Sequence, residues 1–146
     1  MTKSILITGA SGFLGAWIMQ RLSKEDVDVI ACDLRPDETR LQMVTEGHAP
    51  ANVTWEQLDV SDTDKAVALA KRYEPAAIIH LAALLIPDCR DNPPAAVRIN
   101  VLGDANMFEA ARQVGNTSVV FTSSAAARPR GPKNRVANLY GAFKAV

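Results

Sequence analysis

Two residues near the end of the chain have the types and the spacing needed to move a proton. Tyr140 and Lys144 are four residues apart, so on a helix they share one face. A phenol acts as a base near neutral pH only when a nearby positive charge favours its ionised form, and an ammonium about 4 Å away supplies that charge. Ser124 and its neighbour Ser123, earlier in the chain, could offer a hydroxyl that orients a substrate oxygen. These residues predict acid–base chemistry at a hydroxyl group.

A glycine-rich turn near the start of the chain has the spacing needed to hold a phosphate. An apolar run over residues 5–8 ends at Gly9, and two further glycines follow at intervals of three. The first allows a tight turn out of a strand, Gly12 lets backbone N–H groups approach an anion, and Gly15 lets a helix pack closely. A helix that begins here directs its free N–H groups at a phosphate. The predicted phosphate-binding residues are Gly9, Ser11, Gly12, Phe13, Leu14 and Gly15.

An acidic residue follows at the distance expected for the ribose of a dinucleotide. Asp33 ends the second predicted strand, 24 residues after Gly9. Its carboxylate can accept hydrogen bonds from the adenosine ribose hydroxyls and would repel a 2′-phosphate. Arg35 lies two residues on and could instead accommodate that phosphate. The sequence therefore predicts cofactor contacts at both residues and favours NAD over NADP, with NADP as the alternative.

Two later strand ends carry further candidates for cofactor binding. Asp59 could hydrogen-bond an adenine amino group, or it could be a turn residue ahead of a helix capped by Ser61. Small residues after the fourth strand leave room for a ribose against the backbone, and we interpret His80 before them as a packed core histidine. The predicted cofactor-binding residues at these two ends are Asp59, Val60, Leu81, Ala82 and Ala83.

The longest predicted helix places one amide where it should face the sheet. Asn100 lies on a stripe of small and apolar residues, and a buried amide without a partner costs about 1–3 kcal/mol. We expect it to bond the backbone after the fourth strand and to shape the cofactor site, although a purely structural amide is also possible. The other side of the helix carries Val97, Val101 and Phe108, which predicts that a second subunit or further chain covers it.

Short apolar runs alternate with helical stripes along the whole chain. The runs predict strands over residues 4–8, 27–32, 53–58, 76–81 and 118–122. Helices are predicted after the glycine turn, from Pro36 to Gly47, from Ser61 to Pro75, from Asn92 to Gly115, and over residues 137–146. This alternation predicts an α/β fold, a Rossmann-type doubly wound parallel sheet of five strands in the order 3-2-1-4-5. We interpret residues 1–146 as a single NAD(P)-binding domain, the N-terminal part of a longer protein without its C-terminal substrate region.

Composition excludes several classes of partner. Sixteen basic and sixteen acidic residues give no net charge, which argues against nucleic acid or an anionic membrane as partner. No stretch approaches the ~20 apolar residues of a membrane span. Two cysteines, Cys32 in an apolar run and Cys89 in a loop-like segment, form no disulfide framework and no metal motif. We therefore expect a cytoplasmic protein with no metal and a small-molecule substrate.

Six motifs, taken together, resemble one superfamily. They are T-G-x-x-G-x-x-G over residues 8–15, D-V at 59–60, H-L-A-A at 80–83, N-V-L-G at 100–103, F-T-S-S at 121–124, and Y-x-x-x-K at 140–144. In this order they resemble the extended short-chain dehydrogenase/reductase superfamily, in its epimerase/dehydratase-like branch. The resemblance covers the whole chain.

The resemblance implies roles for particular residues. Tyr140 would be the acid/base, Lys144 would hold the nicotinamide ribose, and Ser124, with Ser123 as the alternative, would bond the reacting oxygen. Tyr140 and Lys144 thus also count as cofactor-binding residues, together with Asn100.

The implied activity is hydride transfer between NAD and a hydroxyl of a sugar or sugar-derived substrate. A plain dehydrogenase, an epimerase and a dehydratase are not separated by these residues. The alternative is a non-catalytic dinucleotide-binding module or an inactive fragment, and we expect the 146-residue chain alone to be inactive. The resemblance also implies a homodimer that pairs through the long helix and the last helix.

Overall fold

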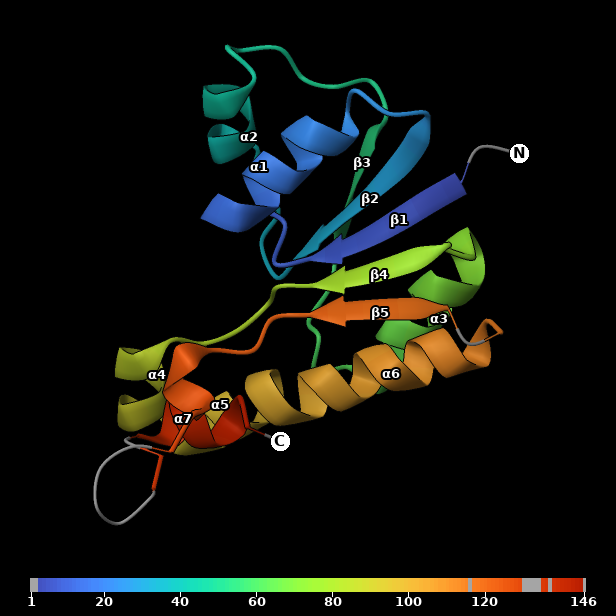
Figure 1. The fold of residues 1–146 in the computed structure, drawn as a ribbon. Coiled ribbons are helices and arrows are strands. Elements are labelled where there is room, and N and C mark those ends of the chain that lie inside the picture. The colour runs from blue at the N-terminus through green and yellow to red at the C-terminus, as the bar shows by residue number, and fades with distance from the viewer. Residues whose placement is uncertain (1–2, 116, 130–134, 137, 146) are drawn as a thin grey trace.

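Five parallel strands form the centre of the molecule. The computed structural model describes residues 3–115, 117–129, 135–136 and 138–145. The strands lie in the order β3-β2-β1-β4-β5, which confirms the predicted sheet (Figure 1). Their bounds are β1 Lys3–Thr8, β2 Val27–Asp33, β3 Val53–Gln57, β4 Ala77–His80 and β5 Ser118–Phe121. Each strand end lies within one residue of its predicted position.

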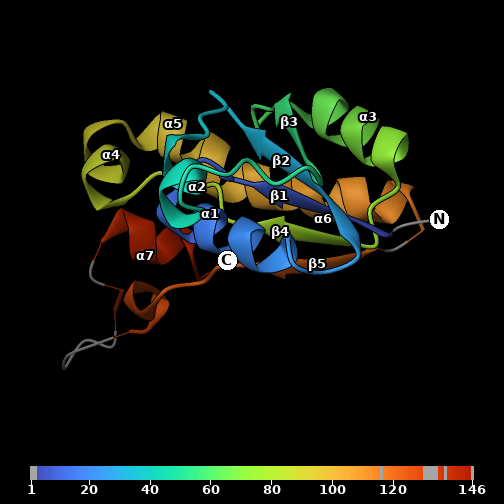
Figure 2. The ribbon, with the colours of Figure 1, turned by 90° about the horizontal axis from the view of Figure 1, so that it is seen from above.

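Helices cover both faces of this sheet. Two lie on one face, α1 (Phe13–Leu22) and α2 (Thr39–Val44), and α3 (Thr63–Tyr73) and α6 (Gly103–Gln113) lie on the other (Figure 2). Three short helices gather beyond the carboxyl ends of the strands (Figure 1). They are α4 (Ile86–Asp91), α5 (Pro93–Val97) and α7 (Leu139–Phe143). Within the described residues no helix is long and apolar enough to cross a membrane.

Alternate residues of the central strands supply two separate cores. Leu6 and Ile30 point to the α3–α6 side, whereas Ile7 and Val29 point to the α1–α2 side. All four side chains are buried. Burial on both faces explains why the strands read as continuous apolar runs rather than as alternating patterns.

The long helix is confirmed as one run, with a local change of pitch. It begins at Pro93 after Asn92, whose side chain caps it, and continues from α5 into α6 through a π-helical turn, Arg98–Leu102. Gly115, with φ +92°, follows its end as predicted. The extra residue of a π turn shifts the helical stripe, and such turns occur often at functional sites.

Three local predictions are wrong. Asp62, not Ser61, caps α3 by accepting the Lys65 N–H, because Ser61 is itself bonded to Asp59. Helix α2 begins at Thr39 rather than at Pro36, because the chain between them turns back toward the glycine turn. The segment around Cys89, interpreted as loop-like, forms α4.

Candidate cofactor site

The glycine turn is fixed by contacts that leave no room for a side chain. Gly9 has φ +69°, and a Cβ atom there would lie 2.6 Å from the backbone nitrogen of Ala82. A Cβ on Gly15 would collide with the carbonyl oxygen of Ala10. The turn after β1 and the segment after β4 are therefore in direct backbone contact.

The first turn of α1 leaves backbone donors free for an anion. Gly12 is the N-cap and has no side chain to accept a hydrogen bond. The N–H groups of Phe13, Leu14 and Gly15 thus have no acceptor within the helix. They point out of the helix start together with its partial positive charge, an arrangement that binds phosphate groups.

The predicted cofactor residues converge on one hollow at the carboxyl ends of the strands. This strand-end hollow has a volume of about 350 Å³. The predicted residues that line it are Gly9, Gly12, Asp33, Asp59, Val60, Leu81, Ala82 and Ala83. Four lining residues were not predicted, namely Leu34, Leu58, Leu84 and Ile99. Each of the four is next to a predicted residue in the sequence. Leu34, Leu58 and Leu84 adjoin the predicted residues at or after the strand ends, and Ile99 precedes Asn100 in the long helix. Arg35 is exposed and does not line it.

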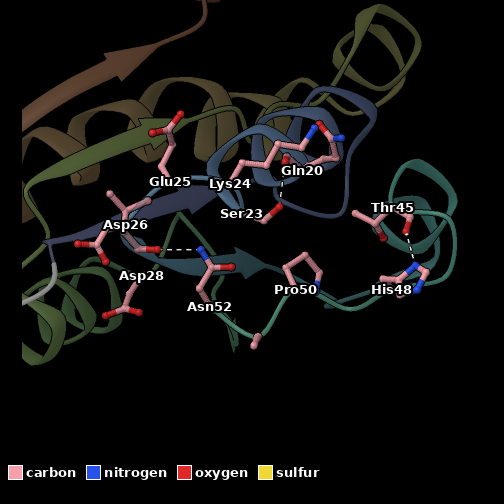
Figure 3. Close-up of a pocket in the computed structure, with 12 residues that line it drawn as sticks. Gln20, Ser23, Lys24, Glu25, Asp26, Asp28, Thr45, His48, Pro50 and Asn52 are labelled. Carbon is pink, nitrogen blue, oxygen red and sulfur yellow. Dashed lines mark hydrogen bonds between the residues drawn. The ribbon is translucent and has the colours of Figure 1, made fainter.

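A second hollow, of about 560 Å³, lies at the opposite end of the sheet (Figure 3). It opens between the end of α1 and the loop before β3. Asn52 on its wall donates to the Val27 carbonyl at 2.8 Å and is occupied in joining that loop to β2. The residues lining it include none of the predicted site residues.

Asp33 and Ser11 join the glycine turn to the end of β2. The Ser11 N–H donates to Asp33 Oδ2 at 3.0 Å, its hydroxyl accepts from the Asp37 N–H at 2.9 Å, and its carbonyl accepts from Arg40 Nη1 at 3.0 Å. Ser11 therefore holds the turn in place, and Asp33 keeps its second oxygen for a ligand. The roles of Asp37 and Arg40 were not predicted, because both bonds join residues that are far apart in the sequence.

The two functions considered for Asp59 are compatible. Its Oδ1 accepts from the Ser61 N–H at 2.9 Å and from the Ser61 hydroxyl at 2.7 Å, as a turn residue does. The residue also lines the strand-end hollow. Asn106 of α6 steadies this loop, since its amide donates to the Val60 carbonyl at 2.8 Å.

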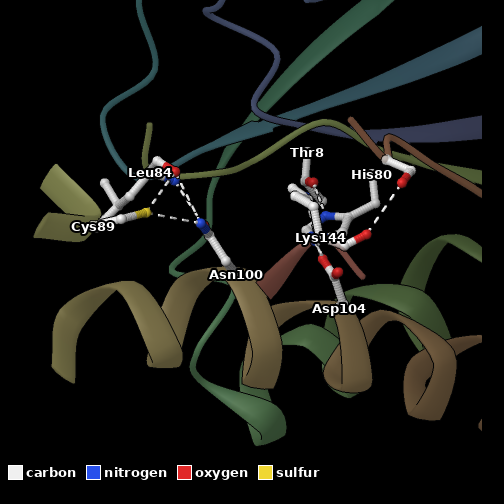
Figure 4. A network of polar contacts seen from close by, with 8 residues as sticks. Thr8, His80, Leu84, Cys89, Asn100, Asp104 and Lys144 are labelled. Carbon is white, nitrogen blue, oxygen red and sulfur yellow. Dashed lines mark hydrogen bonds and ion pairs between the residues drawn. The ribbon is translucent and has the colours of Figure 1, made fainter. Parts of the chain in front are cut away.

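Asn100 bonds the backbone after β4, as expected (Figure 4). Its Oδ1 accepts from the Leu84 N–H at 2.7 Å, and its Nδ2 donates to the Leu84 carbonyl at 2.8 Å. The same Nδ2 lies 3.4 Å from Cys89 Sγ. Asn100 is fully buried in the π turn and fixes the wall of the hollow opposite the glycine turn.

The predicted catalytic residues are only partly brought together. Ser124 and Lys144 line a broad third hollow between β5 and α7, and Ser123 lines it with them. Ser124 Oγ accepts from the Ala126 N–H at 3.1 Å, and Ser123 Oγ donates to the Lys144 carbonyl at 3.1 Å. Tyr140 is half-buried on α7 and is not among the residues lining this hollow.

Four polar side chains form a buried cluster behind these residues (Figure 4). His80 Nδ1 lies 2.5 Å from Thr8 Oγ1, and His80 Nε2 lies 2.8 Å from Asp104 Oδ1. Lys144 Nζ lies 4.0 Å from the same oxygen. The Lys144 side chain is only 1% exposed, and its Nζ has no hydrogen bond to a described residue. His80 is buried, which agrees with its interpretation as a core residue.

The family model described as NAD dependent epimerase/dehydratase family matches residues 5–145. The chain belongs to this family.

Named relatives agree with this membership of the epimerase/dehydratase family. The chain is 33% identical over 148 residues to the probable polysaccharide biosynthesis protein EpsC of Bacillus subtilis, covering 97% of this chain and 24% of EpsC. It is 32% identical over 120 residues to UDP-glucose 4-epimerase of Mycolicibacterium smegmatis, covering 82% of this chain and 38% of that protein. The chain thus spans less than half the length of these relatives.

Solved structures show the same fold. L-threonine dehydrogenase from Clostridium difficile superposes with a TM-score of 0.81 at 30% identity, covering 99% of this chain and 46% of that one. Uronate dehydrogenase from Agrobacterium tumefaciens, in a mutant form complexed with NAD, superposes with a TM-score of 0.77 at 26% identity. That comparison covers 98% of this chain and 52% of the dehydrogenase.

The residues present fit the dinucleotide in the family's name. The glycine turn is a cradle that added Cβ atoms would fill, and free N–H groups border it. Asp33 and Asp59 stand at the strand ends beside it, and the buried Lys144 ammonium lacks a hydrogen-bond acceptor among the described residues. A bound ribose would offer hydroxyl oxygens as such acceptors.

Proposed function

We propose that this chain is the cofactor-binding part of an NAD-dependent dehydrogenase or nucleotide-sugar epimerase. The observation that carries the proposal is the strand-end hollow, in which the glycine turn, Asp33 and Asp59 lie together. Family membership supports the class of enzyme. The names of the relatives support a sugar or nucleotide sugar as substrate, since they include a UDP-glucose 4-epimerase and a uronate dehydrogenase.

Each part of the cofactor has candidate partners in this chain. The N–H groups of Phe13 and Leu14 would bind the pyrophosphate, Asp33 the adenosine ribose, and Asp59 the adenine. Lys144 would bind the nicotinamide ribose. Bound NAD supplies hydride transfer, and the carboxylate of Asp33 disfavours the extra phosphate of NADP.

A calorimetric titration of this chain tests the cofactor assignment. NAD is expected to bind more tightly than NADP, and Asp33→Asn is expected to weaken NAD by roughly tenfold, because about 1.4 kcal/mol of charged hydrogen bonding is lost. Asp37→Asn is the matched control, since Asp37 is exposed in the same loop and does not line the hollow. Tighter binding of NADP than of NAD would refute the assignment.

Tyr140 is the proposed acid/base, and Ser124 the proposed partner of the reacting oxygen. The phenolate would accept the alcohol proton while Lys144 stabilises its charge. In the whole protein that carries this chain, Tyr140→Phe should abolish hydride transfer and leave NAD binding intact. Turnover at the parent rate in that variant would contradict the role.

The second candidate is a chain that binds NAD without turnover. The position of Tyr140 outside the hollow shared by Ser124 and Lys144 favours it. If the unsubstituted full-length protein binds NAD but transfers no hydride to any UDP-sugar or uronate tested, this second candidate is the correct one.

We also propose that the protein pairs as a homodimer through the long helix and the last helix. Val97, Leu102 and Phe108 of the long helix are between 41% and 47% exposed. Val101, predicted on the same side, is half-buried, and Phe108 also packs edge-to-face against Phe121 of β5. Sedimentation should give a dimer, and Val97→Glu should give a monomer because a charge would be buried at the interface. A monomeric unsubstituted protein would refute the pairing.

A further inference from the structure

The buried cluster of Thr8, His80, Asp104 and Lys144 contains one cation that needs a counter-charge. An ammonium removed from water is costly unless an anion compensates it. Asp104 is the acidic residue that contacts Lys144, and its side chain is 14% exposed. It lies in the first turn of α6, directly after the N-V-L-G motif, and was not itself predicted as a site residue.

The two contacts of His80 favour one tautomer of its neutral ring. Its Nε2 lies 2.8 Å from a carboxylate oxygen, and two unprotonated lone-pair atoms would repel at that distance, so Nε2 carries a hydrogen. A neutral His80 then accepts at Nδ1 from the hydroxyl of Thr8, 2.5 Å away. This assignment gives Asp104 and Lys144 equal and opposite charges, whereas a protonated His80 would leave the buried cluster with a net positive charge.

The contact of His80 with Asp104 is electrostatic rather than a well-aligned hydrogen bond. His80 Nε2, Asp104 Oδ1 and Lys144 Nζ are all buried without a hydrogen bond to a described residue. The Lys144 side chain, which follows the five-residue helix α7, is only 1% exposed, and Asp104 is the charged partner of its ammonium. Removing the charge of Asp104 should release it.

We propose that Asp104 is a positioning residue for Lys144. Its carboxylate, in contact with His80 Nε2, holds the Lys144 ammonium in one place, and Lys144 lines the hollow between β5 and α7. This inference rests on the proposed function, in which Lys144 binds the nicotinamide ribose. Asp104 itself need not touch cofactor or substrate.

Nitrogen NMR of the side chains tests the proposal on this chain. The unsubstituted protein should show a protonated Nε2 and an unprotonated Nδ1 at His80, together with a resolved Lys144 ammonium signal. Asp104→Asn should lose the ammonium signal, and Asp104→Glu should restore it. Asp64→Asn is the matched control, because Asp64 occupies the same position in the first turn of α3 but is exposed. Identical His80 and Lys144 signals in Asp104→Asn and in the control would overturn the proposal.

A thermal-unfolding cycle gives a second readout if Asp104→Asn is only marginally folded. Either Asp104→Asn or Lys144→Met alone leaves an uncompensated buried charge. The double variant should therefore melt at a higher temperature than either single variant. Additive losses in melting temperature would overturn the proposal.

The NAD titration separates this inference from the proposed function. If NAD fails to bind while the cycle shows coupling, the proposed function fails and the Asp104–Lys144 pair stands. If NAD binds normally and the cycle is additive, the positioning role fails and the cofactor assignment stands.

Discussion

The two walls of the strand-end hollow are held in different ways. The glycine turn is held by backbone against backbone, since Gly9 and Gly15 contact Ala82 and Ala10 where a Cβ would not fit. The wall after β4 is held by side chains, chiefly by the amide of Asn100 on both polar groups of Leu84. Gly9 and Gly15 in the first wall leave no room for a side chain, and the second wall depends on the hydrogen bonds of Asn100.

This difference affects how readily each wall of the hollow forms and how readily it opens. The Gly15–Ala10 contact lies within one tight turn and forms together with β1 and α1, so ordering it costs little further conformational entropy. The Gly9–Ala82 contact joins that turn to the segment after β4. In the second wall, Asn100 of the π turn bonds Leu84, which precedes α4, and contacts Cys89 within α4. Segments with few contacts open locally at low free energy. We therefore expect the second wall to open more readily than the first.

The largest expected effect is that of a side chain at Gly9. Gly9→Ala combines a left-handed φ of +69° with a Cβ that would lie 2.6 Å from backbone, so we expect a loss of roughly 3–5 kcal/mol of unfolding free energy. Gly47→Ala is the matched control, because Gly47 has φ +82° and nothing within 4 Å of the added atom. It should lose only about 1 kcal/mol. Equal losses in urea unfolding would show that strain, rather than the close contact, fixes the first wall.

Removing the amide of Asn100 tests the second wall. Asn100→Ala leaves the N–H and carbonyl of Leu84 without their partner, so we expect a loss of roughly 2–3 kcal/mol. Asn92→Ala removes only an exposed helix cap and should cost about 1 kcal/mol. A smaller loss for Asn100→Ala than for Asn92→Ala, measured by urea unfolding, would show that the amide of Asn100 does not hold the second wall.

The same difference explains what the sequence could and could not predict. The spacing of Gly9, Gly12 and Gly15 is a local pattern, and the strand order and most of the hollow followed from it and from the alternation of elements. Asn100 was found because a lone amide on an apolar stripe needs a partner. Asp104 was missed because an aspartate in the first turn of a helix is ordinarily a solvated residue. Its neighbours His80 and Lys144 lie in other parts of the chain, and no local sequence pattern predicts that these three residues come into contact.

One cysteine lies next to each wall of the hollow, and the reactivity of its thiol measures how often that wall opens. Cys32 lies in β2, where its backbone carbonyl accepts from the Ala10 N–H of the first wall at 3.1 Å. Cys89 lies in α4, where its thiol donates to the Leu84 carbonyl at 3.3 Å. At pH 8, a thiol reagent should modify Cys89 at least about tenfold faster than Cys32, because local opening exposes only Cys89. Single-cysteine variants followed by mass spectrometry give the rates, and Asn100→Ala should raise the Cys89 rate further. A faster reaction at Cys32 would reverse the order of stability of the two walls.

The smallest effect is a pH dependence that belongs to the first wall. Burial, with smaller contributions from the charges of Glu56 and Asp33, raises the pKa of Cys32 from 9.0 to about 12. Because the folded pKa is the higher one, this stabilisation is complete below pH 9 and is lost as the pH rises toward 12. At pH 10 the loss is about 1.4 kcal/mol of unfolding free energy. The unfolding free energy of Cys32→Ala should therefore depend less on pH between 8 and 10. Other groups that titrate at alkaline pH, such as Tyr73, are present in both proteins. If the unfolding free energies of the two proteins fall equally with pH over that range, the Cys32 thiol is not confined as the packing of β2 requires. The first wall would then open as readily as the second.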